Sequence, residues 1–535
     1  MTKSEELAGI VVDRCVEIGV REFVLCAGSR NSPLVLEILS RVPKLRVWTC
    51  FEERCAAFFA LGRTRALDVP VAVITTSGTA AAELFPAVIE AHYQRQPLLC
   101  ITADRPKSFR GSGAPQAIEQ ANLFGNYARN SWDIEADFIV GGYDGLGVFW
   151  DESDEFSLTS WDGWGPAQLN VCFCEPLLSE SPRQSNSDSK IVPAKRLAAR
   201  PVESADIEID AEDLLVMLGS IRESDRKEVA ELLLKTGAPI LADATSGLRG
   251  DPDLDHLMLK SGDGCLKNRK PKAVLRIGGV PTSRFWRDLE NLPEIRVVSV
   301  LANGFSGLAR NSELVDLLES LKLIGKPETS ILAVDYQRTT RLNSILSRLP
   351  ASEPAYFRNL SQHIQAPSVV FLGNSMPIRE WNLAARDNSR LSIHANRGAN
   401  GIDGNLSTFL GLAAGAEEAW GIFGDLTTMY DLAAPTLLQQ LLPTTKIRIV
   451  VINNQGGKIF SRLPSLAALP ENDKQVIENH HEISFAPWAK MWNLDYRLVR
   501  RGDPIPSALP NRVVIEIQPD SAQTEQLWIE YAELD

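Results

Sequence analysis

Two short apolar runs, each ending in a polar segment that contains glycine, constrain the fold of this chain most. Residues 420–423 lead into Gly424 and Asp425, and the β-branched run 447–452 leads into the segment 453–457, Asn-Asn-Gln-Gly-Gly. Both runs have the length and composition of buried strands, and Pro435 lies between them where a first helical turn tolerates proline. The leucines that recur between them at helical spacing are Leu432, Leu438, Leu441 and Leu442. A right-handed crossover would make the strands parallel neighbours, so both polar segments should emerge at one carboxyl edge, where α/β proteins bind ligands.

That edge would offer the carboxylate of Asp425, the side-chain amide of Asn454 and a glycine-rich backbone. Hard oxygen ligands of this kind suit Mg²⁺ or Ca²⁺, and such sites usually share the ion with phosphate groups. The alternative is that Asp425 caps a helix and residues 453–457 form an ordinary turn. Either segment alone favours this alternative. The pair, with each member following a strand one crossover apart, favours the ion site.

Strand-to-loop transitions of the same kind fill the N-terminal region. An amphipathic helix is expected over residues 5–19, and a helix of small residues over 55–62. Strand-like runs that lead into loops begin at residues 22, 47, 71 and 98. Four such transitions within about 100 residues predict a parallel, doubly wound sheet.

The length of 535 residues favours about three domains, because a single hydrophobic core stops growing well below that size. Residues 178–205 have linker composition, and a second linker is expected near 326–352. We therefore predict three α/β domains, 1–180, 205–335 and 345–535, each with a doubly wound parallel sheet. The middle domain has no Gly-x-Gly-x-x-Gly loop after a strand, which argues against a dinucleotide. After Phe485 we expect a helix, a strand and a final helix.

Composition excludes several classes of function. The net charge of −13 and the pI near 5.2 argue against a nucleic-acid or membrane-surface partner. No segment approaches the roughly 20 apolar residues of a membrane span, and the N-terminus does not resemble a signal peptide. The eight cysteines are scattered, as is typical of reduced thiols in a cytoplasmic protein, and no spacing resembles a zinc site. His480 and His481 lie in a polar stretch and are expected at the surface.

The Gly-Asp segment, the crossover and the Asn-Asn segment together resemble the thiamine-diphosphate fingerprint. On that resemblance Asp425, Asn454 and the carbonyl of Gly456 hold Mg²⁺ or Mn²⁺, and the metal holds the diphosphate of the cofactor. Thr427 and Thr428 could donate their hydroxyls to the diphosphate.

Further segments resemble one family of thiamine-diphosphate enzymes, the 2-succinyl-5-enolpyruvyl-6-hydroxy-3-cyclohexene-1-carboxylate synthases of menaquinone biosynthesis. The resemblance spans nearly the whole chain. The segments that match in order and spacing are residues 28–33, 51–54, 76–80, 102–106, 116–118, 165–171, 374–379, 394–404 and 458–464. The chain departs from the family pattern at Glu52, where an aspartate is expected, and at Ser283, where a second basic residue is expected.

The resemblance implies three catalytic residues. Glu53 would hydrogen-bond the pyrimidine nitrogen N1′, and burial should raise the pKa of its carboxyl group. Ile402, flanked by glycines, would prop the two rings of the cofactor into a bent shape, so that proton transfer is intramolecular. Arg397 would act on the substrate. The alternative for Glu53 is a glutamate in the first turn of a helix that interacts favourably with the helix dipole. The alternative for Ile402 is a core isoleucine in a tight loop.

The resemblance also implies the remaining binding residues. It places the cofactor against Glu53, Ser77, Gly401, Ile402, Gly424, Asp425, Leu426, Thr427, Asn454, Gly456, Ile459 and Phe460. It places substrate against Ser29, Arg30, Arg105, Gln116, Arg284, Ser375, Arg379, Arg397, Ile459, Phe460 and Leu463.

The implied reaction is a thiamine-diphosphate-dependent decarboxylation of 2-oxoglutarate. The resulting enamine then adds to isochorismate. Several arginines in loops at strand edges of an acidic protein fit this reaction, because arginine binds carboxylate in a bidentate fork and the two substrates together bring four carboxylates. The family builds each active site across the interface of a homodimer or homotetramer. Two alternatives remain open: another thiamine-diphosphate 2-oxo acid decarboxylase or carboligase, and a non-catalytic binding protein with the same fold.

Overall fold

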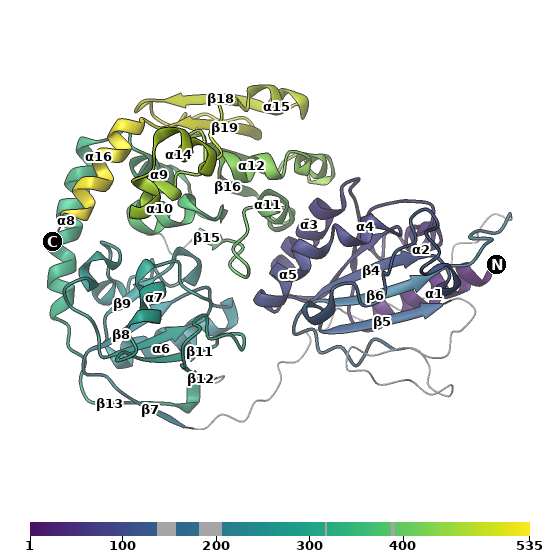
Figure 1. The fold of residues 1–535 in the computed structure, drawn as a ribbon, viewed down its shortest axis with the longest axis horizontal. Helices are drawn as coiled ribbons and strands as arrows, with labels where there is room; N and C mark the ends of the chain where they lie inside the picture. Colours follow the sequence, from purple (N-terminus) through teal and green to yellow (C-terminus); the bar gives the residue numbers. More distant parts are fainter. Residues whose placement is uncertain (136–156, 181–205, 316–317, 387–390, 535) are drawn as a thin grey trace. The chain divides into compact units, whose positions relative to one another are not determined.

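The computed structural model describes residues 1–135, 157–180, 206–315, 318–386 and 391–534 (Figure 1). The chain divides into two compact units. Unit 1 takes residues 1–201, 398–415 and 431–443, whereas unit 2 takes residues 202–397, 416–430 and 444–535. Two short pieces of the C-terminal region therefore belong to the same unit as the N-terminal region.

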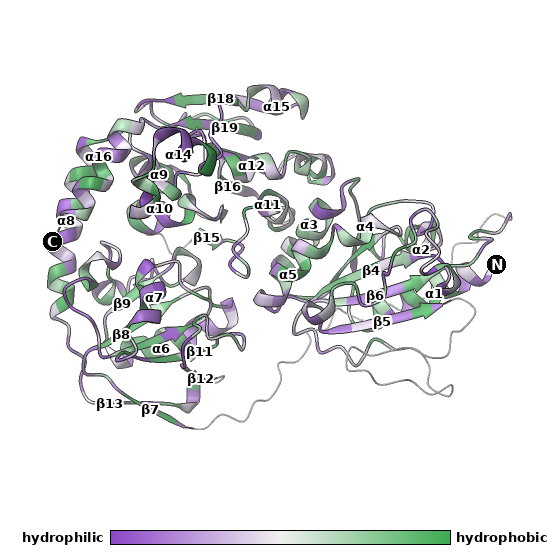
Figure 2. Cartoon of the chain, viewed as in Figure 1, coloured by the Kyte–Doolittle hydropathy of each residue, from purple (hydrophilic) through white to green (hydrophobic). Residues whose placement is uncertain are grey.

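Unit 1 is built on a six-stranded sheet with the strand order β2-β1-β3-β4-β6-β5, in which every pairing is parallel. Its strands are β1 (Glu22–Leu25), β2 (Arg46–Thr49), β3 (Val71–Thr75), β4 (Leu98–Asp104), β5 (Asn130–Glu135) and β6 (Ala167–Cys172). The strands β3, β4 and β6 are buried along their whole length. Strands covered on both faces are mostly apolar along their length, and Figure 2 shows β4 largely in the hydrophobic colour, whereas β6 also buries the amides of Gln168 and Asn170.

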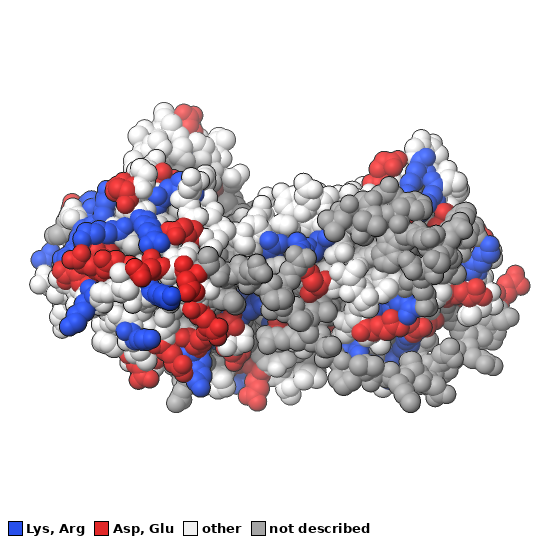
Figure 3. Space-filling view, turned by 90° about the horizontal axis from the view of Figure 1, so that it is seen from below, with Lys and Arg blue, Asp and Glu red and all other residues white. Residues whose placement is uncertain are grey.

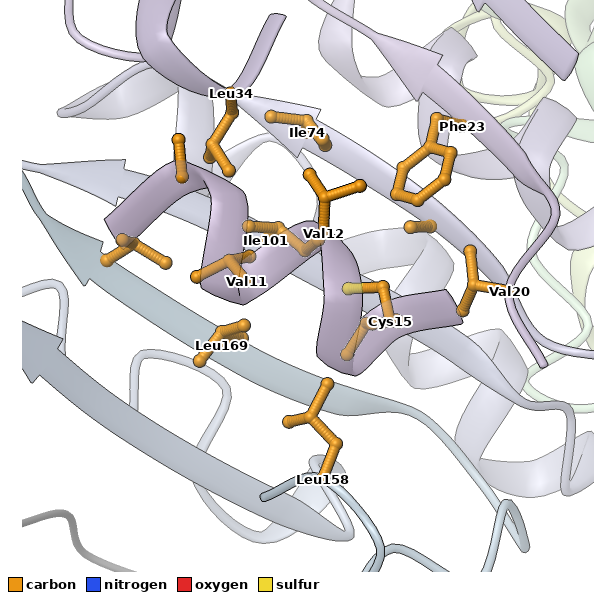
Figure 4. Packing of buried hydrophobic residues seen from close by; sticks show 14 of the residues in the cluster. Val11, Val12, Cys15, Val20, Phe23, Leu34, Ile74, Ile101, Leu158 and Leu169 are labelled. Carbon is orange, nitrogen blue, oxygen red and sulfur yellow. The ribbon is translucent and has the colours of Figure 1, made fainter. Parts of the chain in front are cut away.

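The helices of unit 1 are α1 (Lys3–Glu17), α2 (Ser32–Ser40), α3 (Glu53–Leu67), α4 (Thr79–Ala82), α5 (Phe85–Gln94) and α11 (Asn405–Ala413). A capping box begins α1, with Thr2 and Glu5 each accepting a hydrogen bond from the backbone of the other. Figure 4 shows α1 on the sheet, where its side chains Val11, Val12 and Cys15 join a buried cluster with residues from β4 and β6. The helix expected over residues 5–19 is thus confirmed, two residues earlier in the chain.

Helix α3 begins at Glu53 because the side chain of Glu52 caps it, accepting hydrogen bonds from the backbone N–H groups of Arg54 and Cys55. Along its length α3 packs against α11. The two helices approach closely at Gly62, where a Cβ would lie 2.2 Å from the carbonyl oxygen of Thr408. This close approach fixes where the residues that precede α11 sit relative to α3.

Unit 2 contains a five-stranded parallel sheet with the order β12-β11-β10-β8-β9 and a parallel pair, β13-β7. These strands are β7 (Ile207–Asp210), β8 (Leu214–Leu218), β9 (Ile240–Ala242), β10 (Ala273–Ile277), β11 (Arg296–Val300), β12 (Glu313–Val315) and β13 (Leu321–Ile324). The associated helices are α6 (Arg226–Thr236) and α7 (Arg284–Asp288).

Unit 2 also contains a six-stranded parallel sheet with the order β15-β14-β16-β17-β19-β18. Its strands are β14 (Ser368–Leu372), β15 (Leu391–His394), β16 (Glu418–Gly424), β17 (Lys446–Ile452), β18 (Asp495–Arg500) and β19 (Arg512–Gln518). Its helices are α8 (Ser330–Arg348), α9 (Glu353–His363), α10 (Met376–Ala384), α12 (Asp425–Tyr430), α13 (Pro464–Ala467), α14 (Glu471–Ile477), α15 (Ala486–Met491) and α16 (Ser521–Ala532). The expected parallel neighbours are β16 and β17, in register from Glu418 opposite Lys446 to Gly424 opposite Ile452.

The predicted fold class, doubly wound parallel sheets, is confirmed, but three details differ. No loop follows β16, because α12 starts directly at Asp425. The leucine repeat lies around a 3-10 helix, η9 (Ala434–Gln440), and Leu432 and Leu442 are exposed. Beyond Phe485 the structure has two strands rather than the one expected. The additional strand is β18, a mostly exposed edge strand with charged residues, and it has no apolar run that would mark it in the sequence.

The domain boundaries 1–180, 205–335 and 345–535 stay a prediction. The first predicted linker, residues 178–205, lies mostly outside the described residues. The second predicted linker is wrong, because most of it forms the helix α8. The buried Asp335 of α8 accepts hydrogen bonds from the backbone N–H groups of Lys260 and Ser261, which docks this helix on the preceding part of unit 2.

Acidic and basic side chains are intermixed on the face that Figure 3 shows. Among the described residues no helix is both long enough and apolar enough to cross a bilayer.

Candidate active site

The carboxyl ends of β16 and β17 bring Asp425 and Gly456 together in unit 2. The Oδ2 atom of Asp425 accepts a hydrogen bond from the backbone N–H of Gly456 at 2.9 Å, and Oδ1 accepts one from the N–H of Leu426 at 2.6 Å. The Asp425 side chain is buried. Gly456 has a φ of +140°, and a Cβ there would lie 2.7 Å from the carbonyl oxygen of Glu478, so this position requires glycine.

Asn454 presents an unpartnered oxygen at the same edge. Its Nδ2 atom donates a hydrogen bond to Oε2 of Glu353 at 2.9 Å, which fixes the orientation of the amide. Its Oδ1 atom is buried, and no described group hydrogen-bonds to it. A buried amide oxygen without a partner, beside a carboxylate and a glycine backbone, fits a hard divalent cation. The residues present therefore fit a metal-held diphosphate.

The predicted diphosphate segment surrounds Asp425. Gly424 ends β16, and Leu426 and Thr427 lie in the first turn of α12. Thr427 is buried, whereas the neighbouring Thr428 uses its hydroxyl to bond the carbonyl oxygen of Gly424 at 2.9 Å. Ile459, Phe460 and Leu463 lie in and beside the 3-10 helix η10 (Phe460–Arg462), where all three are partly exposed.

Two arginines gather at the carboxyl end of the neighbouring strands β14 and β15. Arg397 donates to Oδ1 of Asn374 at 2.9 Å, and Arg379 donates to the carbonyl oxygen of Ser375. Burial, and to a smaller extent the positive charge of Arg397, lower the pKa of Arg379 to about 10. Two guanidinium groups close enough to lower a pKa in this way favour an anionic ligand between them.

Glu53, the first residue of α3, lies in unit 1 and is partly buried. Burial raises the pKa of its carboxyl group, and the charges of Glu52 and Glu83 add to the rise. This is the direction that the sequence predicts for a carboxyl group that must bond the cofactor in its protonated form. Ser77 follows β3 and is also buried, while Gly401 and Ile402 lie in the loop before α11.

Among the other substrate candidates of unit 1, Arg30 and Arg105 have hydrogen-bond partners within the unit. Arg30 is buried, donates to the carbonyl oxygen of Phe173 at 3.0 Å and pairs with Glu175 at 3.2 Å. Arg105 donates to the carbonyl oxygen of Pro115 at 2.8 Å, next to the exposed Gln116. Ser29 is exposed. The fold therefore holds the side chains of Arg30 and Arg105 in defined orientations.

Comparisons with known proteins bear on this geometry. Residues 5–123 match the family model described as "Thiamine pyrophosphate enzyme, N-terminal TPP binding domain". The 2-succinyl-5-enolpyruvyl-6-hydroxy-3-cyclohexene-1-carboxylate synthase of Akkermansia muciniphila is 40% identical, over 97% of each chain, and that of Bdellovibrio bacteriovorus is 39% identical, over 98% of each. This chain belongs to the 2-succinyl-5-enolpyruvyl-6-hydroxy-3-cyclohexene-1-carboxylate synthase family. The resemblance drawn from its motifs is thus confirmed, and so is thiamine diphosphate as the cofactor.

A solved structure extends the comparison of the fold beyond the synthase family. Benzoylformate decarboxylase from Polynucleobacter necessarius superposes with a TM-score of 0.62, over 97% of this chain and 98% of that one, at 13% identity. At that identity the likeness concerns the fold alone.

One expectation about this synthase chain is wrong. His481 is not a surface residue: its side chain is 9% exposed, and its Nε2 atom lies 3.3 Å from Oδ2 of Asp425. The segment that carries it folds back onto the sheet edge because Asn453 donates a hydrogen bond to the carbonyl oxygen of Ile483 at 2.8 Å. No sequence signal marks this return, since the surrounding residues are polar.

Sequence reasoning also missed a buried pair of glutamates. Glu353, which holds Asn454, is the first residue of α9, and Glu380 lies on α10. Burial raises the pKa of both carboxyl groups, and the neighbouring Glu353 adds to the rise at Glu380. Glu353 thus reaches the predicted metal site through one amide, from about 100 residues earlier in the chain.

Arg284 lies on α7 with its side chain 63% exposed, 3.7 Å from Asp288. In contrast, the positive charge of Arg287, on the same helix, contributes to the lowered pKa of Arg379. Nearby, the buried Asp243 accepts hydrogen bonds from Thr282 and Asn382, and the charge of Arg397 opposes the rise in its pKa that burial causes. The assignment of Arg284 to substrate stays a prediction.

Proposed function

We propose that this chain decarboxylates 2-oxoglutarate and joins the remaining four-carbon unit to isochorismate, giving 2-succinyl-5-enolpyruvyl-6-hydroxy-3-cyclohexene-1-carboxylate and CO₂. One observation carries the proposal. Arg379 and Arg397 gather at the ends of β14 and β15, and β14 is the direct neighbour of β16, which leads to Asp425. This arrangement supports a site for two carboxylate-bearing substrates next to the residues that fit a metal-held diphosphate.

Thiamine diphosphate, when bound, supplies a carbanion at C2 of its thiazolium ring and takes up the electron pair that CO₂ leaves behind. Asp425, Asn454 and the Gly456 carbonyl would hold Mg²⁺ or Mn²⁺ on its diphosphate. Glu53 would hold a proton at the pyrimidine nitrogen N1′, which requires a carboxyl group with a raised pKa. Ile402 would press against the rings. Ile459, Phe460 and Leu463 would form an apolar wall.

The remaining residues would bind and orient the substrates. Arg379 and Arg397 would take carboxylate groups in bidentate hydrogen bonds, with Ser375 beside them. Arg30, Arg105, Ser29 and Gln116 come from unit 1. The direct test is to incubate the protein with thiamine diphosphate, Mg²⁺, 2-oxoglutarate and isochorismate and to follow the loss of isochorismate. Turnover of pyruvate in place of 2-oxoglutarate, without consumption of isochorismate, would contradict the proposal.

Arg397→Ala should lower kcat/KM for the substrates by roughly 10–100-fold, because a hydrogen bond to a charged group contributes about 1.5–3 kcal/mol. The affinity for thiamine diphosphate, measured by fluorescence titration, should stay unchanged. The matched control is Arg296→Ala, which removes an exposed arginine paired with Glu313 at 2.7 Å. Equal kinetics for Arg397→Ala and wild type would remove Arg397 from the site.

We further propose that the chain works in the cytoplasm as a homodimer or homotetramer. Glu53 of one chain would serve the cofactor held by Asp425 and Asn454 of its partner. Mixing inactive Glu53→Gln and Asp425→Ala chains should then restore roughly a quarter of wild-type activity, since half of the random dimers carry one intact site. No recovery after unfolding and refolding the mixture, with wild type refolded in parallel, would contradict a shared site.

A further inference from the structure

A buried carboxylate hydrogen-bonds to the start of the loop that carries Gly401 and Ile402. Glu90 lies on α5, and its side chain reaches two consecutive backbone N–H groups of this loop. Oε1 accepts from Gly398 at 2.7 Å, and Oε2 accepts from Ala399 at 2.7 Å. The residue is only 3% exposed. A Cβ at Gly398 would lie 2.6 Å from the carbonyl oxygen of Glu90, so the loop touches the α5 backbone as well.

A second buried carboxylate holds the other end of the loop. Oδ1 of Asp431 accepts from the N–H of Gly404 at 3.0 Å, and Oδ2 accepts from those of Leu406 and Ser407 at 2.8 and 3.2 Å. Asp431 is 1% exposed, and it follows α12 in the chain, well away from the loop in sequence. It satisfies the free N–H groups at the start of α11.

Between these two ends, hydrogen bonds within the loop and close packing against α3 restrain its backbone. Nδ2 of Asn405 donates to the carbonyl oxygens of Gly401 and Asp403, each at 3.0 Å. Gly404 has a φ of +68°, and a Cβ there would lie 2.0 Å from the ring of Phe58 on α3. The backbone on both sides of Ile402 is therefore fixed by hydrogen bonds and by close packing.

We propose that Glu90 and Asp431 are positioning residues that clamp the two ends of the 398–404 loop and so hold Ile402 in place against the rings of the cofactor. The role of Ile402 in this clamp rests on the proposed function but not on the identity of the substrates. The hydrogen bonds of Glu90 and Asp431 to this loop are all made with backbone N–H groups, so each residue acts through the backbone. Because a branched side chain that must press on a ring has to be held within a fraction of an ångström, a loop anchored at one end would not suffice.

The test uses Glu90→Gln and Asp431→Asn, which keep the size of each side chain but put an amide N–H₂ against a backbone N–H. Hydrogen–deuterium exchange of the apoprotein, followed by mass spectrometry, should show peptides covering 398–407 exchanging at least about tenfold faster in each variant. Glu6→Gln, which alters an exposed glutamate in α1, is the control and should exchange as wild type.

The second readout is the exchange of the C2 proton of bound thiamine diphosphate, measured without substrate by acid quench and NMR. We expect each variant to slow this exchange about tenfold. A double-mutant cycle separates positioning from general loss of stability: in the background of Ile402→Ala, Glu90→Gln should slow C2 exchange by less than about twofold further.

Additive losses in the cycle, or wild-type exchange of residues 398–407 in both variants, would overturn the proposal. Failure of the proposed function gives a different result. A non-catalytic binding protein would show no C2 exchange in wild type, and another thiamine-diphosphate decarboxylase would exchange C2 without consuming isochorismate. In both cases hydrogen–deuterium exchange of the apoprotein would still test the clamp. If one variant does not fold, the other tests the opposite end of the loop independently.

Discussion

Replacing Glu53 with glutamine should lower kcat by about 10²–10⁴-fold, the usual contribution of a positioned acid–base group. Glutamine has the size of glutamate, but its amide N–H₂ can only donate a hydrogen bond and cannot transfer a proton to the pyrimidine nitrogen. The raised pKa of Glu53, caused chiefly by burial, indicates a carboxyl group prepared for that bond. The measurement is steady-state turnover together with the rate of C2 proton exchange in the bound cofactor.

The size-matched control for this change is Glu6→Gln, which makes the same chemical substitution at an exposed position in α1. Both variants should keep the melting temperature of wild type, because the side chain that caps α3 is that of Glu52 and stays unchanged. A Glu53→Gln protein that exchanges the C2 proton at the wild-type rate would show that another group activates the cofactor.

Asp425→Ala should weaken the binding of the metal and of thiamine diphosphate by at least about 100-fold. Changes to groups that merely orient a metal ligand already cost 10–100-fold. The change removes a predicted metal ligand. It also removes the acceptor of the hydrogen bond from the N–H of Gly456 at 2.9 Å, so the Gly456 backbone loses its fixed position beside the predicted metal site. Binding of Mn²⁺ in the presence of thiamine diphosphate, followed by electron paramagnetic resonance, measures the effect directly.

Asp473→Ala removes an exposed aspartate from α14 in the same unit and should bind Mn²⁺ as wild type does. Asp425→Asn separates the two roles of the carboxylate, since it keeps one oxygen that can accept a hydrogen bond but loses the negative charge. Wild-type affinity for Mn²⁺ in Asp425→Ala would exclude Asp425 as a ligand and would move the metal site elsewhere.

The parallel sheets could be predicted because buried parallel strands are continuous apolar runs, and the loops after them contain glycine and polar residues. The strand β18 could not be predicted in this way. Its residues Asp495 and Arg497 face solvent at the sheet edge, so no apolar run marks it. The helix α8 was mistaken for a linker because its polar residues obscure the buried Ile331, Leu342, Ile345 and Leu346.

The same contrast holds at the site. The position of Asp425, Asn454 and Gly456 at one sheet edge could be predicted because each lies within a few residues of the end of a strand, where position along the chain decides position at the sheet edge. Glu353, Glu90 and His481 reach functional loops from distant elements, and nothing near them in sequence records those contacts.

The sequence by itself determined the family, the cofactor and the buried parallel strands that precede the candidate site, because these depend on local runs of residue types and on motifs with fixed spacing. Only the tertiary structure decided which groups hold the loops in place. The orientation of the Asn454 amide depends on Glu353, and the course of the 398–404 loop depends on Glu90 and Asp431. Such hydrogen bonds join residues that folding alone brings within 3 Å of each other.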